Sequence, residues 1–116
     1  MENKNPNEEI EKLARDYQII QEQLRNTKLQ IEQLQIQQTE LGIAENEVKN
    51  ATGKIYRTVG GVIVESDKDS SLKDIAEKKE TTGLRIQRLN KQLEELNKRE
   101  AELRNKILQL QKGGSV

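Results

Sequence analysis

The chain has 116 residues, of which 34% are charged and 2% are aromatic, with 20 basic and 20 acidic residues and no cysteine. The balanced charge offers no basic field for nucleic acid, and the missing cysteines exclude a disulfide framework and a thiolate metal site. No apolar run is long enough for a signal core or a membrane span, so we expect a soluble cytoplasmic protein.

The first expected element is a long helix over residues 6–50. Asn5 can cap it, Pro6 suits the first helical position, and Glu8 can reach back to the cap amide. From Ile10 onward the a and d positions of a coiled coil repeat without a break, which favours a coiled coil over a generic amphipathic helix. These seam positions are Ile10, Leu13, Tyr17, Ile20, Leu24, Thr27, Ile31, Leu34, Gln38, Leu41, Glu45 and Val48.

Residues 54–65, KIYRTVGGVIVE, predict a β-hairpin because two β-favouring runs flank a Gly-Gly pair. A hairpin alone is marginal in water, and the chain offers no other strand to cover its edges. We therefore expect an assembly element. Its residues are Ile55, Tyr56, Val59, Gly60, Gly61, Val62, Ile63 and Val64.

A second helix is expected over residues 70–112, capped by Ser70 or Ser71, with Ser71 and Asp74 forming a capping box. Residues 1–5 and 113–116 are expected to be flexible ends. The second helix carries its own unbroken heptad register. Its seam positions are Leu72, Ile75, Lys79, Thr82, Ile86, Leu89, Leu93, Leu96, Glu100, Leu103, Ile107 and Leu110.

The two registers match in length and phase, which predicts that the chain folds back on itself. Seam residues then pair so that their numbers add up to 120, as for Leu24 with Leu96. The expected fold is mostly α, a long antiparallel intramolecular coiled coil with one central β-hairpin, in a single domain over residues 1–116. Nine of the twelve seam positions in each helix are apolar. The free energy gained by burying them is modest compared with the backbone entropy that folding costs, so we expect the chain to oligomerise.

Polar residues interrupt the seam near the hairpin, where Gln38, Glu45, Lys79 and Thr82 should cluster. Two interpretations are equally open. The helices loosen there as they enter the strand region, or the polar residues fix the register of the coiled coil.

A second apolar stripe repeats every seven residues on the outer face of the first helix. Scattered surface aliphatics are common, but the heptad spacing favours contact with a neighbouring subunit. The stripe consists of Leu29, Ile36 and Ile43.

Catalysis needs titratable groups held in a pocket, and this chain has no histidine, no cysteine and no expected pocket. We therefore expect no enzyme activity and no cofactor. Asp67, Asp69 and Ser71 resemble the start of a calcium loop, but Leu72 and Lys78 stand where its glycine and glutamate belong, so no metal site is expected.

The order of helix, hairpin and helix resembles the β-type subunits of the prefoldin family, in their archaeal form. The similarity runs from about Glu8 to Leu110 and centres on Tyr56, Val59, Gly60 and Val64, in the pattern Y-x-x-V-G-x-x-x-V. One hairpin resembles the β type, since the α type carries two. Many relatives have a polar residue in place of Gly61, which affects the turn type more than the identity.

The resemblance implies a hetero-hexamer of two α-type and four β-type subunits, in which the hairpins join into a β-barrel. It also implies an ATP-independent co-chaperone that holds non-native proteins at the coiled-coil tips and delivers them to a group II chaperonin. The expected tip residues are Ile10, Leu13, Ile107, Leu108 and Leu110.

Two other functions stay open from the sequence. One is a structural tether or scaffold that binds no client. The other is a coiled coil associated with nucleic acid, which the charge balance disfavours.

Overall fold

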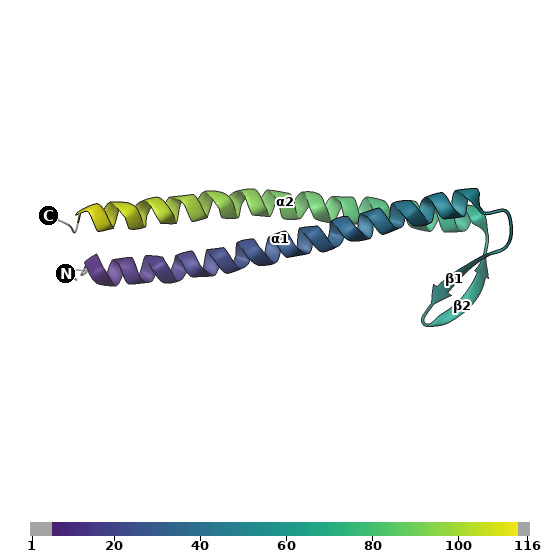
Figure 1. The fold of residues 1–116 in the computed structure, drawn as a ribbon, viewed down its shortest axis with the longest axis horizontal. Helices are drawn as coiled ribbons and strands as arrows, with labels where there is room; N and C mark the ends of the chain where they lie inside the picture. Colours follow the sequence, from purple (N-terminus) through teal and green to yellow (C-terminus); the bar gives the residue numbers. More distant parts are fainter. Residues whose placement is uncertain (1–5, 114–116) are drawn as a thin grey trace. The chain divides into compact units, whose positions relative to one another are not determined.

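The computed structural model describes residues 6–113, which form two helices and two strands (Figure 1). They are α1 (Pro6–Asn50), β1 (Ile55–Val59), β2 (Val62–Ser66) and α2 (Lys68–Gly113). The proposed Asn5 cap and the expected flexible residues 1–5 and 114–116 lie outside the described part. The chain divides into two compact units: a terminal unit of Met1–Gln30 with Leu89–Val116, and a hairpin unit of Ile31–Arg88.

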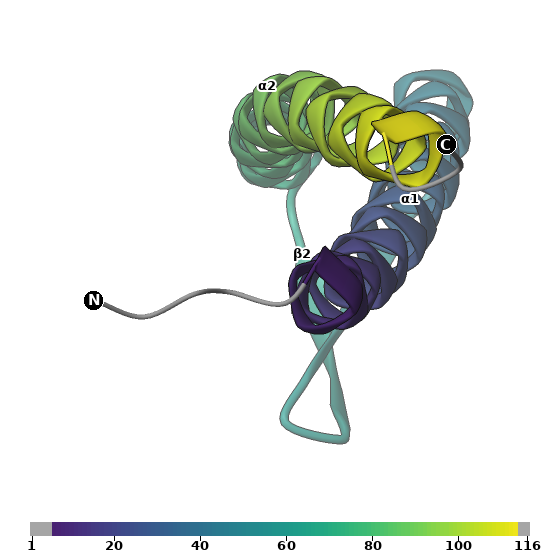
Figure 2. The same cartoon turned by 90° about the vertical axis from the view of Figure 1, so that its left-hand side faces the viewer.

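In the terminal unit, the first half of α1 and the second half of α2 lie side by side in both views (Figures 1 and 2). Their core is formed by Ile20, Leu24 and Leu96, with Leu93 and Leu103 packed against it. All five are seam residues. Ile20, Leu24 and Leu96 are buried, which contributes about 1.5–3 kcal/mol for each of these three side chains, whereas Leu93 and Leu103 are half-buried. The heptad pattern therefore identifies the packing face of this unit.

One polar contact crosses the seam of the terminal unit. The Tyr17 hydroxyl donates a hydrogen bond of 2.9 Å to Oε1 of Glu100, which also forms an ion pair with Nη1 of Arg104 at 3.5 Å. Tyr17 and Glu100 both occupy a positions. This bond satisfies a polar seam residue without opening the seam.

In the hairpin unit, the polar seam residues meet as the sequence predicts. Nε2 of Gln38 donates to the Lys79 carbonyl at 3.0 Å, and Nζ of Lys79 lies 3.2 Å from Oε2 of Glu45. Thr82 is buried in the same unit. Directional contacts bridge the two helices at Gln38, Lys79 and Glu45, which favours register fixing over loosening.

The hairpin has its strands in antiparallel register, with Val59 opposite Val62 and Ile55 opposite Ser66. Gly60 and Gly61 have φ values of 57° and 82°, the positive angles that a twist-matched two-residue turn requires. The glycine pair therefore confirms the predicted turn. The strands are shifted by one residue from the expected 54–65, because Lys54 precedes β1 and Ser66 still pairs.

The predicted start of the second helix is wrong by two residues. α2 begins at Lys68, and Asp67 caps it: the Ser70 amide donates to Oδ1 of Asp67 at 2.7 Å and the Ser70 hydroxyl to Oδ2 at 3.0 Å. These hydrogen bonds from Ser70 lower the pKa of Asp67. Asp67 takes the capping position because it directly follows β2 and its carboxylate can accept the hydrogen bonds from Ser70.

The expected capping box at Ser71 does not form for the same reason. Ser71 is already inside the helix, and its hydroxyl lies 2.9 Å from that of Ser66. Asp74 instead pairs with Arg57 of β1. At its other end α2 includes Gly113, one residue beyond the expected limit.

Candidate functional site

The hairpin presents an apolar surface to solvent. Val62 and Ile63 are 61% and 72% exposed, and Tyr56 and Val59 are at least half exposed. The strand register places Val59 and Val62 on one face and Tyr56 and Ile63 on the other. Among residues 6–113, β1 and β2 pair only with each other, so each strand keeps one open edge. Both faces and both edges can therefore take part in assembly.

The base of the hairpin is attached to the helices of its unit. Arg57 forms an ion pair with Asp74 of α2, and the hydroxyls of Ser66 and Ser71 are 2.9 Å apart. Ile55 is half-buried beside a cavity of about 270 Å³ that Val48 and other residues of both helices also line. The base is thus held in place, while the apolar end is exposed to solvent.

The predicted tip residues all fall within the terminal unit. Ile10, Leu13, Ile107 and Leu110 are half-buried, as expected for the end of a seam. Leu108 is about half exposed and lies off the seam. The structure therefore brings these residues into one unit, and client binding by them stays a prediction.

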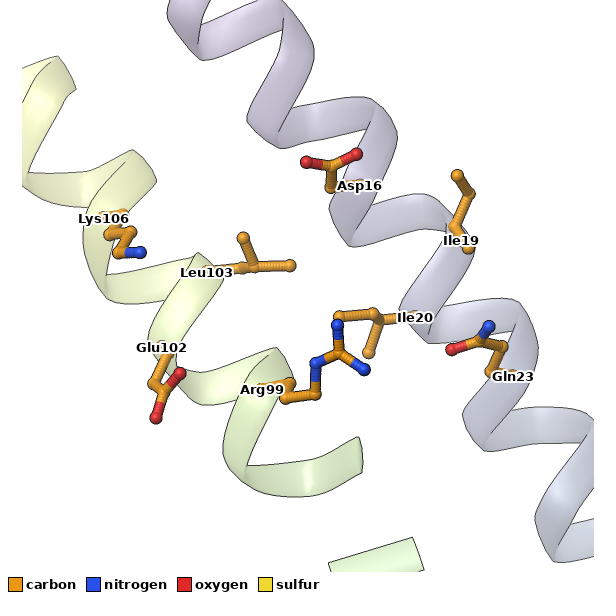
Figure 3. Close-up of a pocket in the computed structure, with 8 residues that line it drawn as sticks. All are labelled: Asp16, Ile19, Ile20, Gln23, Arg99, Glu102, Leu103 and Lys106. Atoms are coloured by element: carbon orange, nitrogen blue, oxygen red, sulfur yellow. The ribbon is translucent and has the colours of Figure 1, made fainter. Parts of the chain in front are cut away.

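A groove lies between α1 and α2 in the same unit, inward of the predicted tip residues in sequence (Figure 3). Its volume is about 410 Å³. Ile20 and Leu103 point toward each other across its floor, and Arg99 reaches from α2 toward Ile20. The residues that line it are Asp16, Ile19, Ile20, Gln23, Arg99, Glu102, Leu103 and Lys106.

The groove combines an apolar floor with a rim of balanced charge. Asp16 and Glu102 supply two carboxylates, and Arg99 and Lys106 supply two cations. Ile19 adds an aliphatic side chain that is more than half exposed. Such a groove can receive an apolar side chain without selecting for the net charge of its ligand.

The heptad pattern does not predict this groove. It marks only Ile20 and Leu103 among the lining residues, and it marks them as seam residues rather than as a binding surface. Ile19 is the signal that could have found it, because it is an aliphatic residue off the seam, like Leu108. The depth of a groove between two helices depends on the flanking side chains of both helices. The heptad pattern of either helix alone does not show this depth.

The predicted outer stripe is exposed along α1. Ile36 and Ile43 in the hairpin unit, and Leu29 in the terminal unit, each have slightly more than half of their surface in solvent. Their contact with a neighbouring subunit stays a prediction.

Residues 6–113 contain neither a metal-ligand cluster nor a helix that could span a membrane. No group of three or more potential metal-ligating side chains comes together there. Neither α1 nor α2, over that range, has an apolar stretch that could cross a membrane.

Comparisons with known proteins agree with this architecture. The family described as "Prefoldin subunit" matches residues 2–114. The prefoldin β subunit of Archaeoglobus fulgidus is 31% identical over 105 residues, which cover 88% of this chain and 90% of that protein. That of Thermococcus onnurineus is 36% identical over 89 residues, covering 75% and 77%.

A solved structure shows the same fold. The crystal structure of the prefoldin β subunit from Thermococcus strain KS-1 matches with a TM-score of 0.79 at 29% identity, over 92% of this chain and 94% of that one. Two long helices joined by one antiparallel hairpin, with the matches in sequence and structure, lead to one conclusion. The chain belongs to the prefoldin family of chaperone subunits, and the resemblance to its archaeal β subunits is confirmed.

Proposed function

We propose that the chain is a subunit of a cytoplasmic, ATP-independent co-chaperone that holds non-native proteins and passes them to a group II chaperonin. Its hairpin joins those of α-type prefoldin subunits and of further copies of this chain. The complete assembly is a hexamer of two α-type and four β-type chains, closed by a β-barrel of hairpins. The stoichiometry and the delivery step rest on family membership.

The exposed hairpin is the observation that carries the proposal. Burying Val62 and Ile63 in an interface would contribute about 1.5–3 kcal/mol for each side chain, before the entropic cost of association. Pairing the open strand edges would also satisfy the free backbone groups of β1 and β2. Monomeric soluble proteins rarely expose an apolar surface of this kind, and such surfaces mark interaction sites.

We propose that clients bind to the terminal unit. Leu108 and Ile19 are exposed aliphatic side chains in that unit, and the groove of Figure 3 has an apolar floor. Non-native chains expose apolar side chains that native proteins bury, so contact by apolar area distinguishes them without a sequence code.

Native mass spectrometry of the complex isolated from its own cells tests the assembly. We expect four copies of this chain with two copies of a different helical-hairpin chain. A homodimer without a second chain would overturn the hexamer and leave a structural tether as the better function.

A second experiment tests the tips. Deleting residues 1–13 and 107–116 from the full complex removes matched ends of the two helices and keeps the rest of the register. We expect an intact hexamer that suppresses the aggregation of a chemically unfolded protein less well but does not lose this activity entirely, because the tip residues are lost and the groove of Figure 3 remains. Full suppression by the trimmed hexamer would refute tip binding and move the client site inward.

A further inference from the structure

A second groove adjoins the first in the terminal unit, on the same side of the helix pair. Its volume is about 340 Å³, and it shares Gln23 and Arg99 with the groove of Figure 3. The rims of both follow one heptad position on each helix, so the two grooves form one continuous track. The rim residues are Asp16, Gln23 and Gln30 on α1, and Gln92, Arg99 and Lys106 on α2.

The length of the track fits a short extended peptide. Residues 16–30 of a helix span about 21 Å at a rise of about 1.5 Å per residue. A strand rises about 3.3 Å per residue, so about six residues of extended chain would fill the track.

The chemistry of the lining changes along the track. Ile19, Ile20 and Leu103 make one end apolar. The other end is rich in carboxamides, since Asn26, Gln30 and Gln92 line it and Gln23 stands where the grooves join. We name these four side chains the amide set.

The amide set is free to bind a ligand. Within residues 6–113 the structure gives its side chains no intramolecular hydrogen bond, and all four are exposed. Each carboxamide offers both a carbonyl acceptor and N–H donors. This combination is complementary to a peptide main chain, which carries one donor and one acceptor per residue.

We propose that the track binds the extended main chain of a non-native protein, with the amide set pairing to peptide groups and the apolar end receiving one aliphatic side chain. The proposal rests on the proposed holdase function, because its ligand is the client. Native proteins pair nearly all of their buried backbone groups, so free main-chain groups on an apolar segment mark a non-native chain whatever its sequence.

The small net charge of the track agrees with a main-chain ligand. Three carboxylates and two cations line it, so no strong field favours acidic or basic segments; they are Asp16, Glu95, Glu102, Arg99 and Lys106. Recognition of peptide groups then supplies affinity that the apolar floor alone does not.

Backbone methylation of the ligand tests the proposal directly. The assembled complex is titrated with a labelled peptide of Ala, Val and Ser, and with the same peptide N-methylated at alternate peptide bonds, by fluorescence anisotropy. The side chains are identical, but the methylated peptide lacks half of its donors. We expect it to bind about tenfold more weakly or worse, as the loss of two or more hydrogen bonds implies. Equal affinities would overturn the proposal.

Variants of the amide set distinguish the two modes of binding, because hydrogen bonding to the amides and contact with apolar area predict opposite changes in affinity. Gln23→Leu and Gln92→Leu keep the side-chain size but remove the amides, and we expect each to weaken binding of the unmethylated peptide about fivefold. If apolar area alone held the peptide, the added leucines would tighten binding, which would overturn the proposal. Gln21→Leu and Asn97→Leu are matched controls, because both residues are exposed and line neither groove.

The outcome also separates this inference from the function on which it rests. A complex that binds both peptides equally and still holds reduced, unfolded lysozyme keeps the holdase function and loses the main-chain site. A complex that binds neither peptide nor the unfolded lysozyme overturns both. Circular dichroism and native mass spectrometry of each variant confirm that helicity and assembly are unchanged.

Discussion

Glu45 occupies a seam position and stays charged there because two lysines surround it. Hydrogen bonds from Lys49 and then Lys79, together with their positive charges, hold the pKa of Glu45 below its ordinary value of 4.5. Lys49 lies one turn along α1, whereas Lys79 reaches across from α2. The carboxylate therefore joins the helices of the hairpin unit through a contact that depends on its ionisation.

This contact predicts a pH dependence of stability. The folded-state pKa of Glu45 lies below its unfolded value, so its stabilisation is complete above about pH 4.5 and is lost as the pH falls through the folded-state pKa. We expect the melting temperature of the Glu45→Gln variant to change less than that of the wild type between about pH 5 and pH 3. Thermal denaturation followed by circular dichroism measures it, and parallel curves for the two proteins would contradict the assignment.

At the scale of single elements, the glycines of the helices differ from those of the turn. Gly42 and Gly83 lie within α1 and α2 in the hairpin unit and have ordinary helical backbone. A Cβ at Gly42 would meet no atom within 4 Å, and one at Gly83 would lie 3.6 Å from Nε2 of Gln38, an ordinary contact distance. Nothing steric requires glycine at either helical position.

Alanine should therefore stabilise the helices at both positions. We expect Gly42→Ala and Gly83→Ala each to raise the free energy of unfolding by about 1 kcal/mol, since glycine costs about that much in a helix. Gly60→Ala is the control: at a φ of 57° it should destabilise the hairpin by about 1 kcal/mol. Chemical denaturation followed by circular dichroism measures the stability of the three variants. A midpoint for Gly42→Ala below that of the wild type would contradict the prediction and show that glycine has a role at this position that packing does not explain.

The helices and the turn could be predicted from the sequence because each depends on local pattern. All predicted seam residues are buried or half-buried, and both turn glycines have positive φ. The start of α2 was missed because Asp67, Ser70 and Ser71 are all capable caps, and only the end of β2 decides between them. The grooves were missed because side chains from two helices distant in sequence form them together.

At the scale of the whole molecule, the exposed surfaces decide how copies of the chain meet. The hairpin offers apolar faces and open edges, and Ile36 and Ile43 add an aliphatic surface on α1 of the same unit. We propose that this part of the outer stripe contacts a neighbouring subunit, beside the assembly formed by the hairpins.

Replacing one residue of the stripe tests this contact. We expect Ile36→Asp to weaken the assembly about tenfold or more, because a charge would be buried against an apolar neighbour. The helicity of the chain should not change, since Ile36 is exposed. Native mass spectrometry across a dilution series measures the effect, and Gln33→Asp at a nearby exposed position is the control. An Ile36→Asp complex as stable as the control would refute the contact.

The matched heptads of α1 and α2 make the length of the helix pair adjustable. In the terminal unit, residues 17–23 lie opposite residues 97–103 in the predicted register. Removing both segments together would therefore leave every remaining seam residue paired with the same partner as before. Each such step changes the length by about 10.5 Å and leaves β1 and β2 unaltered. Evolution, or a protein engineer, could thus change the length of the terminal unit in regular steps, while the means of assembly stays the same.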